Sequence, residues 1–520
     1  MTDAFYITTP IYYVNDNPHI GHAYTTIACD VIARFMRLDG RPVRFLTGTD
    51  EHGQKVEKSA QNHGEAPQAF CNRVSQRFRQ LAEALDISND DFIRTTEDRH
   101  VRATQAIWQR MAEAGDIYLG SYSGWYAVRD EAFYGEDELT VDAAGNRVAP
   151  SGAPVEWVEE PSYFFRLSAW AERLLAFYEA NPGFIAPESR RNEVMSFVRG
   201  GLRDLSISRT TYKWGVPVPG DPDHVMYVWL DALTNYITAI GYPDTDDPLY
   251  RTFWPADLHV IGKDILRFHT VYWPAFLMSA GLEPPKRVFA HGWWTNEGQK
   301  ISKSLGNVID PFELIDTFGL DQTRYFLMRE VPFGNDGDFS RRAVVMRING
   351  ELANGFGNLG LRTLSFIARN CGGSLPEPGA LAEADRQLLA QAEACMGGMR
   401  NAMGRQAVHQ ALQYWNDLVS AANKYIDDQA PWALRKSDPG RMGTVLWVLA
   451  DTIRQIAILA QPFVPAAAAR QLDQLAVPAD ARGFDRIGAA GALAGGTALP
   501  KPEGVFPRVE LPDEEAGAQG

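Results

Sequence analysis

Apolar residues follow two different spacings along the first fifty residues. The run FYITTPIYYV is rich in β-branched and aromatic residues, as expected of a buried strand. The next segment, HAYTTIACDVIARFMRLDG, places Ile27, Val31 and Phe35 at helical spacing and stops at Gly40. RPVRFLTGTDEHG is again typical of a strand and a turn. This order predicts the opening of a parallel, nucleotide-binding sheet.

The same pattern returns in the second half of the chain. MYVWLDAL alternates apolar positions as a strand does, and LHVIGKDILRFH is typical of a strand, a glycine turn and a helix. Between the halves, from about Tyr118 to Phe165, short aromatic pieces and the Gly/Pro-rich stretch AAGNRVAPSGAP break the pattern. The sequence therefore predicts an α/β domain that an insertion interrupts.

Strand signals fade after about Arg347, and VLWVLADTIRQIAILAQPFV has helical spacing. The C-terminal stretch is rich in Gly, Ala and Pro except at VFPRVE, which we expect to dock onto the fold before a disordered acidic tail. We expect the following segments: sheet domain at 1–117 and 206–291, insertion at 118–205, linking region at 292–346, helical domain at 347–475 and tail at 476–520.

Composition and charge narrow the classes of protein. The 520 residues are 45% hydrophobic and 22% charged, which is typical of a folded chain of several domains. A net charge of -15 argues against a broad electrostatic grip on nucleic acid, although a local basic groove is compatible with it. The four cysteines are widely spaced, which favours free thiols in a reducing compartment. The sequence shows no basic and apolar leader and no run of about 18 apolar residues, so we expect a cytoplasmic protein.

Two short motifs are candidates for phosphate chemistry. In NPHIGHAY, His19 and His22 flank Gly21 at the predicted start of a helix, where unpaired N–H groups favour an anion. The alternative is that both histidines only cap the helix or pack there. Far along the chain, KISKS runs from Lys300 to Ser304 between glycines, and its lysines could close over a triphosphate. The alternative is a solvated loop.

The pair of motifs, in this order, marks class I aminoacyl-tRNA synthetases. The chain resembles the methionyl-tRNA synthetase family from residue 5 to about 440, in TTPIYYVNDNPHIGHAY, LTGTDEHGQK, YFFRLS, YVWLDAL, HVIGKDILRFH, HGWW and QAPWALRK. The resemblance implies a Rossmann-type catalytic domain with a connective insertion, followed by a helical anticodon-binding bundle. It also implies activation of methionine with ATP and magnesium to methionyl-adenylate, then transfer to the terminal ribose of initiator and elongator methionine tRNA.

The resemblance also implies roles for single residues. His19, Gly21 and His22 would hold the adenine, ribose and α-phosphate side of ATP, and Lys303, assisted by Lys300, would neutralise the departing pyrophosphate. Asp50 would bind the substrate ammonium. The methionine side chain would lie among Ile11, Tyr13, Trp229, Ala232, Tyr236, Ile265 and His269. Without the resemblance, Asp50 would be called a turn residue and most of the pocket would be called core.

Three positions leave alternatives open. Asp264 would accept from ribose hydroxyls, or else cap a helix. Arg209 would support productive ATP binding, or else be an exposed arginine at a strand end. Leu233 stands where a proline is often expected, so the fine shape of the pocket is not fixed by the resemblance.

The insertion departs from many relatives, which carry a zinc knuckle with CxxC spacing. The matching positions are Ala127 and Asp130, and VAPSGAP has no cysteine, so no structural zinc bound by thiolates is expected. Aromatic packing should replace it, with these candidates: Trp125, Tyr126, Phe133, Tyr134 and Trp157. In the helical domain, Trp432 would stack on an anticodon base, with Asn349 beside it. The alternative is an indole that covers the end of the bundle.

Rival functions fit less well. A cysteinyl-tRNA synthetase would carry zinc-binding cysteines near the first motif. A valyl-, isoleucyl- or leucyl-tRNA synthetase would carry a larger insertion. A non-catalytic tRNA-binding protein would not need Lys303, and a small-molecule adenylyltransferase would not need the helical domain with QAPWALRK. Because no oligonucleotide-binding domain follows the bundle, we expect a monomer. We also expect that the protein binds no membrane.

Overall fold

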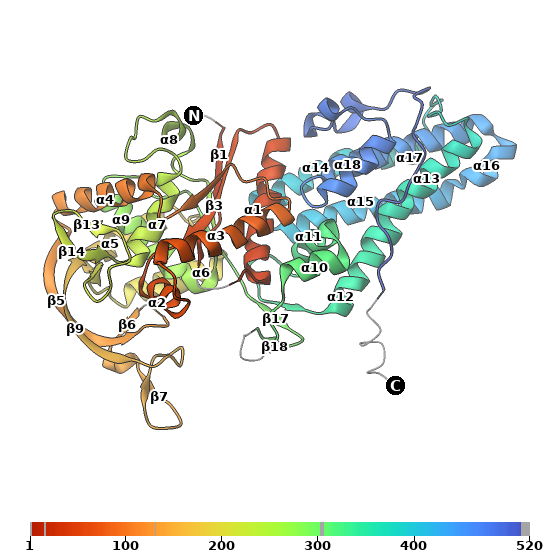
Figure 1. The fold of residues 1–520 in the computed structure, drawn as a ribbon. Coiled ribbons are helices and arrows are strands. Elements are labelled where there is room, and N and C mark those ends of the chain that lie inside the picture. Colours follow the sequence, from red (N-terminus) through yellow and green to blue (C-terminus); the bar gives the residue numbers. More distant parts are fainter. Residues whose placement is uncertain (1–2, 15–16, 131, 302–305, 511–520) are drawn as a thin grey trace. The chain divides into compact units, whose positions relative to one another are not determined.

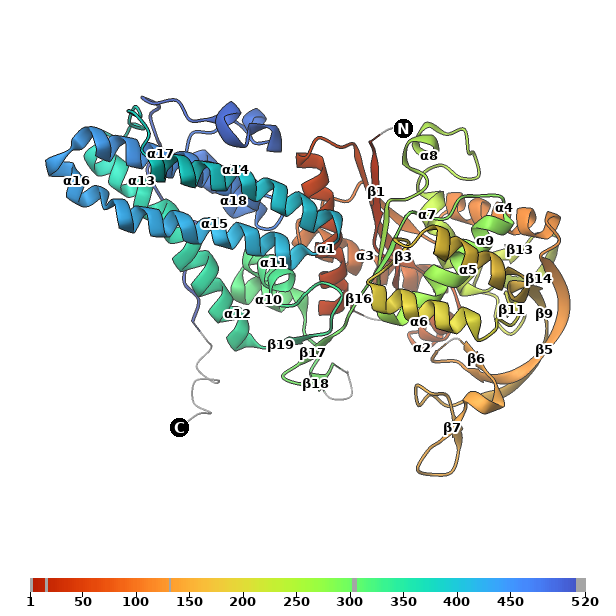
Figure 2. The same ribbon diagram turned by 180° about the vertical axis from the view of Figure 1, so that it is seen from behind.

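The computed structural model describes residues 3–14, 17–130, 132–301 and 306–510. These residues form two compact units, shown in Figures 1 and 2. Unit 1 takes in Met1–Pro18, Arg44–Glu83 and Asn89–His291, and unit 2 takes in His19–Val43, Ala84–Ser88 and Gly292–Gly520. The boundaries of the six segments expected from the sequence stay predictions, because both units draw on separate stretches of the chain.

A seven-stranded sheet lies at the centre of unit 1. Its order is β10, β16, β15, β1, β3, β2, with β4 paired to β3, and neighbouring strands such as β1 and β15 run parallel. The strands are β1 (Phe5–Thr8), β2 (Tyr12–Tyr13), β3 (Val43–Asp50), β4 (Asp91–Arg94), β10 (Ile185–Ala186), β15 (Leu258–Gly262) and β16 (Val288–His291). Asp50 ends β3 and Gly262 ends β15, so the residues that follow them share the carboxyl edge, where open α/β sheets bind ligands.

Helices pack around this sheet, and one of them corrects an expectation. They are α2 (Gln54–Asn62), α3 (Pro67–Ala84), α4 (Asp98–Glu113), α5 (Ala171–Ala180), α6 (Glu188–Arg199), α7 (Val228–Thr238), α8 (Pro248–Phe253) and α9 (Trp273–Ser279). MYVWLDAL was expected to be a strand, but Met226 ends one and α7 begins at Val228. Nearly every residue of α7 is buried, so its apolar pattern carries no helical stripe. The expected strand, turn and helical segment in LHVIGKDILRFH are confirmed as β15, a 3₁₀ turn and a π-helical segment, Phe268–Tyr272.

The insertion is built from antiparallel strands, in contrast to the main sheet. β5 (Ile117–Ala127) and β9 (Glu156–Phe165) form a long curved hairpin, seen in Figure 1, with β6 (Ala132–Tyr134) and β11 (Leu205–Ser206) at its sides. β7 (Thr140–Val141) and β8 (Arg147–Val148) make a small hairpin at its tip. Next along the chain, β12 (Ser208–Arg209), β13 (Pro217–Val218) and β14 (Asp221–Met226) form a three-stranded sheet.

Unit 2 is mainly helical, as the fading of strand signals predicted. Its helices are α1 (Ile20–Leu38), α10 (Pro311–Phe318), α11 (Leu320–Arg329), α12 (Arg341–Arg347), α13 (Asn358–Asn370), α14 (Glu383–Gly404), α15 (Val408–Gln429), α16 (Pro431–Ser437), α17 (Pro439–Ala460) and α18 (Pro465–Gln474), with a π-helical stretch at Ile348–Gly357. A small sheet contains β17 (Trp294–Asn296), β18 (Gln299–Lys300) and β19 (Gly337–Phe339).

A buried arginine anchors α1 within unit 2. Arg324 is fully buried and donates to Asp30 Oδ2 of α1 at 2.6 Å. Its other N–H groups donate to the carbonyl oxygens of Leu85, Pro462 and Phe463. Each guanidinium donor in this set has an acceptor, so the charge is buried without an unsatisfied group. The helix that carries His19 at its start is therefore fixed at its middle.

The C-terminal segment docks onto unit 2 as expected. Val505 and Phe506 are buried, and the Phe506 ring lies 6.4 Å from that of Phe356. The acidic tail expected after it, at 511–520, lies outside the described residues. Among the residues that are described, α17 is long and apolar enough to cross a membrane by length and composition, but 94% of its most apolar window is buried in the fold. That burial is typical of a core helix.

Candidate active site

His19 and His22 cap the helix that follows them. The backbone N–H of Gly21 donates to Nδ1 of His19 at 3.1 Å, and that of His19 donates to Nδ1 of His22 at 3.0 Å. Desolvation, and then the charge of His19, holds the pKa of His22 well below its usual value. Since Nδ1 accepts in both rings, each neutral ring carries its proton on Nε2, a donor suited to a phosphate oxygen. Capping and anion binding are therefore compatible roles.

Gly21 is required by the packing of the same cap. A Cβ atom at this position would lie 2.9 Å from Cε1 of His19, which is closer than real contacts allow. Any other residue would push the His19 ring away from the start of α1. Gly21 therefore leaves room for the His19 ring to cap the helix.

The KISKS loop is described only in part. Lys300 is exposed and ends β18, which pairs with β17 around a turn at Glu297 and Gly298, both with positive φ. Asn307 Nδ2 donates to the carbonyl oxygen of Lys300 at 3.1 Å. Lys303, the residue assigned to the pyrophosphate, lies outside the described residues, so its role stays a prediction.

Asp50 ends β3 at the carboxyl edge of the sheet in unit 1 and is 7% exposed. Its register partner on β2 is Tyr13, one of the residues assigned to the methionine pocket. Ile11, another of them, packs partly buried against the same core. The structure therefore brings Asp50, Tyr13 and Ile11 to one region of unit 1.

The remaining pocket residues come from α7 and from the segment after β15. Tyr236 and His269 share a hydrogen bond of 2.7 Å, and the Trp229 ring lies 6.2 Å from His269 in an edge-on arrangement. Ala232 lies on the same helix as Trp229, and Ile265 accepts from Nδ1 of His269 through its carbonyl oxygen at 3.0 Å. All seven residues assigned to the side-chain pocket therefore lie in unit 1.

The protonation state of His269 follows from these bonds. Its Nδ1–H donates to a carbonyl oxygen, so Nε2 accepts the proton of the Tyr236 hydroxyl. Desolvation is the largest cause that lowers the pKa of His269, to about 4. The pocket wall is therefore a neutral tyrosine and histidine pair, which suits an uncharged thioether.

Arg209 and Asp264 differ from their alternative interpretations. Arg209 is buried, not exposed at a strand end, and its Nη1 donates to Ser206 Oγ at 2.8 Å and to the Ser208 carbonyl at 2.7 Å. Asp264 is an exposed member of the 3₁₀ turn after β15, and Gly262 stands at the N-cap position of that turn. The capping alternative is therefore not what the structure shows.

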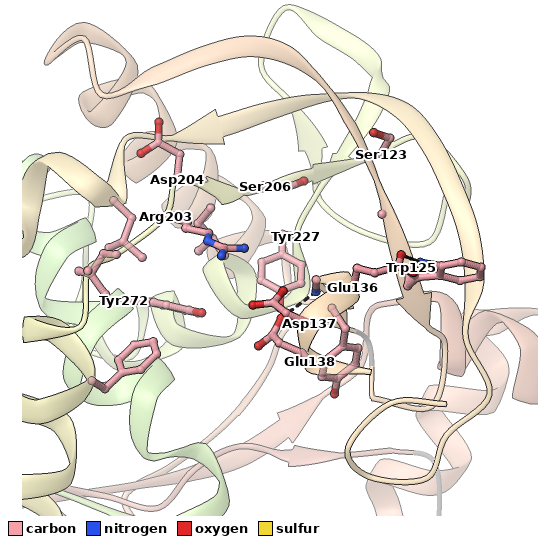
Figure 3. A pocket seen from close by; sticks show the side chains of 18 of the residues that line it. Ser123, Trp125, Glu136, Asp137, Glu138, Arg203, Asp204, Ser206, Tyr227 and Tyr272 are labelled. Carbon is pink, nitrogen blue, oxygen red and sulfur yellow. Dashed lines mark hydrogen bonds between the residues drawn. The ribbon is translucent and has the colours of Figure 1, made fainter. Parts of the chain in front are cut away.

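Arg209 also borders the cavity shown in Figure 3. The cavity holds about 690 Å³ and lies between the insertion and the sheet domain of unit 1, with Tyr227, Phe268 and Tyr272 in its wall. Figure 3 shows Arg203 and Tyr272 pointing toward the acidic turn of Glu136, Asp137 and Glu138. Its volume is that of a small-molecule site.

The insertion combines the expected aromatic packing with small residues and hydrogen bonds. Ala127, Ala149 and Ala153 form a small core, and Asp130 accepts from the Tyr134 hydroxyl at 3.0 Å and from Ser151. Of the expected aromatics, Trp125 and Trp157 pair edge to face at 5.4 Å and Tyr126 is buried. The side chain of Phe133 lies outside the described residues. Alanines, hydrogen bonds and aromatic rings, among them Tyr134 against the alanine core, therefore occupy the knuckle.

Trp432 is 45% exposed at the start of α16, after Ala430, which has a positive φ of 42°. The Arg362 guanidinium lies 5.0 Å from its ring centre and is paired with Asp427 at 2.6 Å. Asn349, expected beside the indole, instead binds the backbone of Val509, donating at 2.8 Å and accepting at 2.9 Å. Arg362 of α13 therefore lies beside the indole, and the role of Asn349 at the anticodon stays a prediction.

Sequence reasoning missed other residues of the site as well. Phe268 stacks on Trp229 with 3.7 Å between ring centres, and Asp231 of α7 bonds two histidines, His52 and His100. His52 lies two residues after Asp50, so the sequence alone could have suggested that His52 lies near the site. No signal in the sequence pairs it with a residue 179 positions away.

Known proteins match this chain over nearly its whole length. The family described as class I tRNA synthetases (M) matches residues 5–364, and the anticodon-binding domain of methionyl tRNA ligase matches residues 375–518. The methionine–tRNA ligase of Brucella suis is 60% identical over 513 residues, 99% of each chain, and that of Mesorhizobium japonicum is 60% identical over 515, also 99% of each.

Solved structures agree with these matches. The methionyl-tRNA synthetase of Mycobacterium tuberculosis in complex with methionyl-adenylate is 55% identical with a TM-score of 0.95, covering 98% of this chain and 100% of that one. Its apo form has a TM-score of 0.89 at 52% identity, covering 98% and 99%. The parallel sheet, the HIGH cap and the helical unit define a class I aminoacyl-tRNA synthetase. Within that class, the chain belongs to the methionyl-tRNA synthetase family.

Proposed function

We propose that this protein activates methionine with ATP to form methionyl-adenylate and pyrophosphate, and then transfers methionine to the terminal ribose of initiator and elongator methionine tRNA. The observation that supports it best is the neutral Tyr236 and His269 pair beside Trp229, in the same unit as Asp50. An apolar, uncharged wall and a carboxylate are the two features that a thioether amino acid requires. Membership of the family supports the same reaction.

The first step needs little acid or base chemistry. The methionine carboxylate is already ionised near neutral pH, so it can attack the α-phosphorus of ATP without a general base. What the reaction needs is alignment of the two substrates and stabilisation of charge on the phosphates. His19 and His22 supply Nε2–H donors at the start of α1, and the dipole of that helix adds to them.

The other roles in this proposal follow the resemblance. Asp50 binds the ammonium, Asp264 accepts from the ribose hydroxyls, and Arg209 supports ATP binding. Lys303, assisted by Lys300, meets the growing charge on pyrophosphate. Magnesium enters as part of the substrate, the Mg²⁺–ATP complex.

Transfer to tRNA uses the helical unit in this proposal. The exposed indole of Trp432 and the neighbouring guanidinium of Arg362 offer a stacking surface and a positive charge to an unpaired anticodon base. We also propose that the protein acts as a monomer in the cytoplasm, where its four free cysteines remain reduced.

ATP–pyrophosphate exchange with every proteinogenic amino acid tests the first step. Methionine should support exchange at a rate far above all others. Charging of methionine tRNA, measured on the same preparation, tests the second. Exchange with a different amino acid, or none with methionine, would overturn the proposal.

A further inference from the structure

A buried carboxylate joins the two ends of the methionine site. Asp231 lies on α7 between Trp229 and Ala232 and is 1% exposed. Its Oδ2 accepts from Nδ1 of His52 at 2.6 Å, and its Oδ1 accepts from Nε2 of His100 at 2.8 Å. His52 lies two residues after Asp50. One side chain thus bonds the loop after β3 to the helix that carries the pocket.

His100, which is itself fully buried, bonds the second oxygen of this carboxylate. Its Nδ1 lies 3.2 Å from the Thr238 hydroxyl, which donates its own proton to the Thr234 carbonyl. The Thr104 hydroxyl near Nε2 likewise donates to the His100 carbonyl. Both ring nitrogens of His100 therefore lie within hydrogen-bond distance of polar side chains, and each oxygen of Asp231 has a histidine partner. Desolvation by burial acts to raise the pKa of Asp231, but His52 and then His100 lower it to about 2.

The other side of the same loop is tethered independently. Glu51, between Asp50 and His52, is fully buried and accepts from Arg94 Nε at 2.7 Å and Nη2 at 2.9 Å. Its backbone N–H donates to Thr95 Oγ1, and its carbonyl accepts from Trp214 Nε1 at 2.6 Å. Glu51 is thus fixed to β4 and its neighbours, and the bond from His52 to Asp231 ties the same loop to α7.

Burial alone does not account for the cluster. A buried ion pair is weak evidence for stability, since apolar residues of similar volume often replace one at no cost. Removing one partner is costly, so such a cluster holds its members at fixed separations. Here the cluster fixes the separation between Asp50, which would bind the ammonium, and the pocket residues Trp229 and Ala232, which would bind the side chain.

We propose that Asp231 is a positioning residue that determines specificity: through His52 it sets the distance from Asp50 to the pocket residues Trp229 and Ala232, and so selects an amino acid of the length of methionine. This inference rests on the proposed function. Amino acids that are one methylene shorter or longer meet both ends only when this distance can change.

The test compares substrates of different length in ATP–pyrophosphate exchange. The kcat/KM values of L-methionine, S-methyl-L-cysteine and L-ethionine are measured for the wild type and for Asp231→Asn. The ratio of kcat/KM for methionine to kcat/KM for each analogue should fall by about tenfold or more. The reason is that kcat/KM falls most for methionine, whose length matches the wild-type distance. The KM for ATP should stay within about twofold of the wild-type value.

Two further variants separate positioning from folding. His52→Leu removes the donor and should reduce the same ratio, whereas His52→Asn keeps an N–H near the position of Nδ1 and should restore it. Asp257→Asn is the matched control, since Asp257 is a largely buried carboxylate of unit 1 that binds the Tyr6 amide and Lys286. It should alter stability without changing the ratio.

The outcomes distinguish the two proposals. An unchanged ratio in His52→Leu, or an equal loss for all three amino acids in Asp231→Asn and His52→Leu, overturns the positioning role and leaves the proposed function standing. If Asp231→Asn does not fold, the contrast between His52→Leu and His52→Asn decides. A wild type that does not exchange with methionine would overturn the proposed function, and this inference with it.

Discussion

The neutral ring of His269 makes the protein sensitive to acid. Between its ordinary pKa of 6.5 and its folded pKa of about 4, the unfolded chain binds a proton at this residue and the folded chain does not. The free energy of unfolding therefore falls as pH drops through this range, and above it protonation of His269 costs no stability. For His269 alone the loss should be about 2 kcal/mol between about pH 7 and about pH 5.

Urea unfolding at the two pH values, on the wild type and on His269→Gln, measures this loss. The comparison is needed because burial also lowers the pKa of His259 and His22. The variant should show a smaller loss of unfolding free energy than the wild type. Identical losses would mean that His269 is not buried neutral.

Lys303 is expected to act on charge that develops during the reaction. Lys303→Ala should lower the rate of adenylate formation by about a hundredfold or more while the dissociation constant of methionine stays within about twofold, because pyrophosphate gains charge only as it leaves. Single-turnover kinetics and tryptophan fluorescence titration measure the two quantities. Lys286→Ala, which removes a surface lysine paired with Asp257, is the control and should change neither. A rate equal to that of the wild type would exclude this lysine from the mechanism.

Single elements also decide how sequence signals are interpreted. α1 was predicted correctly because its apolar stripe and its histidine cap are local features. α7 was mistaken for a strand because both of its faces are buried, so alternation and helical spacing cannot be told apart there. Helix was expected at Phe268–Tyr272 and at Ile348–Gly357, but not its π-helical form, since the extra residue per turn depends on packing.

α16 should carry the anticodon contact. Trp432→Ala should weaken tRNA binding by roughly 1 to 3 kcal/mol, which is the value of one base stacked on an aromatic ring. Charging at subsaturating tRNA should fall by about tenfold or more, while ATP–pyrophosphate exchange stays near normal.

The matched control for this element is Tyr414→Ala, because Tyr414 is an aromatic of similar exposure, 46% against 45%, in the same unit. It should leave charging unchanged. Arg362→Ala should weaken charging as well, since its guanidinium lies against the indole. Equal loss of exchange and charging in Trp432→Ala, with a lower melting temperature, would mean that the ring is structural.

At the scale of the whole molecule, the chain should need no zinc. The purified protein should contain less than one zinc ion per molecule. It should keep its activity after exhaustive chelation once magnesium is restored. The reason is that Ala127 and the hydrogen bonds of Asp130 occupy the matching positions of the knuckle. Mass spectrometry of bound metals and exchange assays measure both quantities. Activity that only zinc restores would contradict the prediction.

The sequence by itself determined the class of fold, the helical domain after about Arg347, the helix that begins at the HIGH motif and the resemblance that names the reaction. These depend on signals within a few residues, on apolar spacing, and on motifs whose order can be read along the chain. Only the tertiary structure decided that Arg362 lies beside Trp432, that Asn349 binds Val509 and that Asp231 ties His52 to α7. Each of these pairs residues far apart in the chain, so the contact forms only when packing brings them together, as a guanidinium 5.0 Å from a ring centre or as hydrogen bonds of about 3 Å.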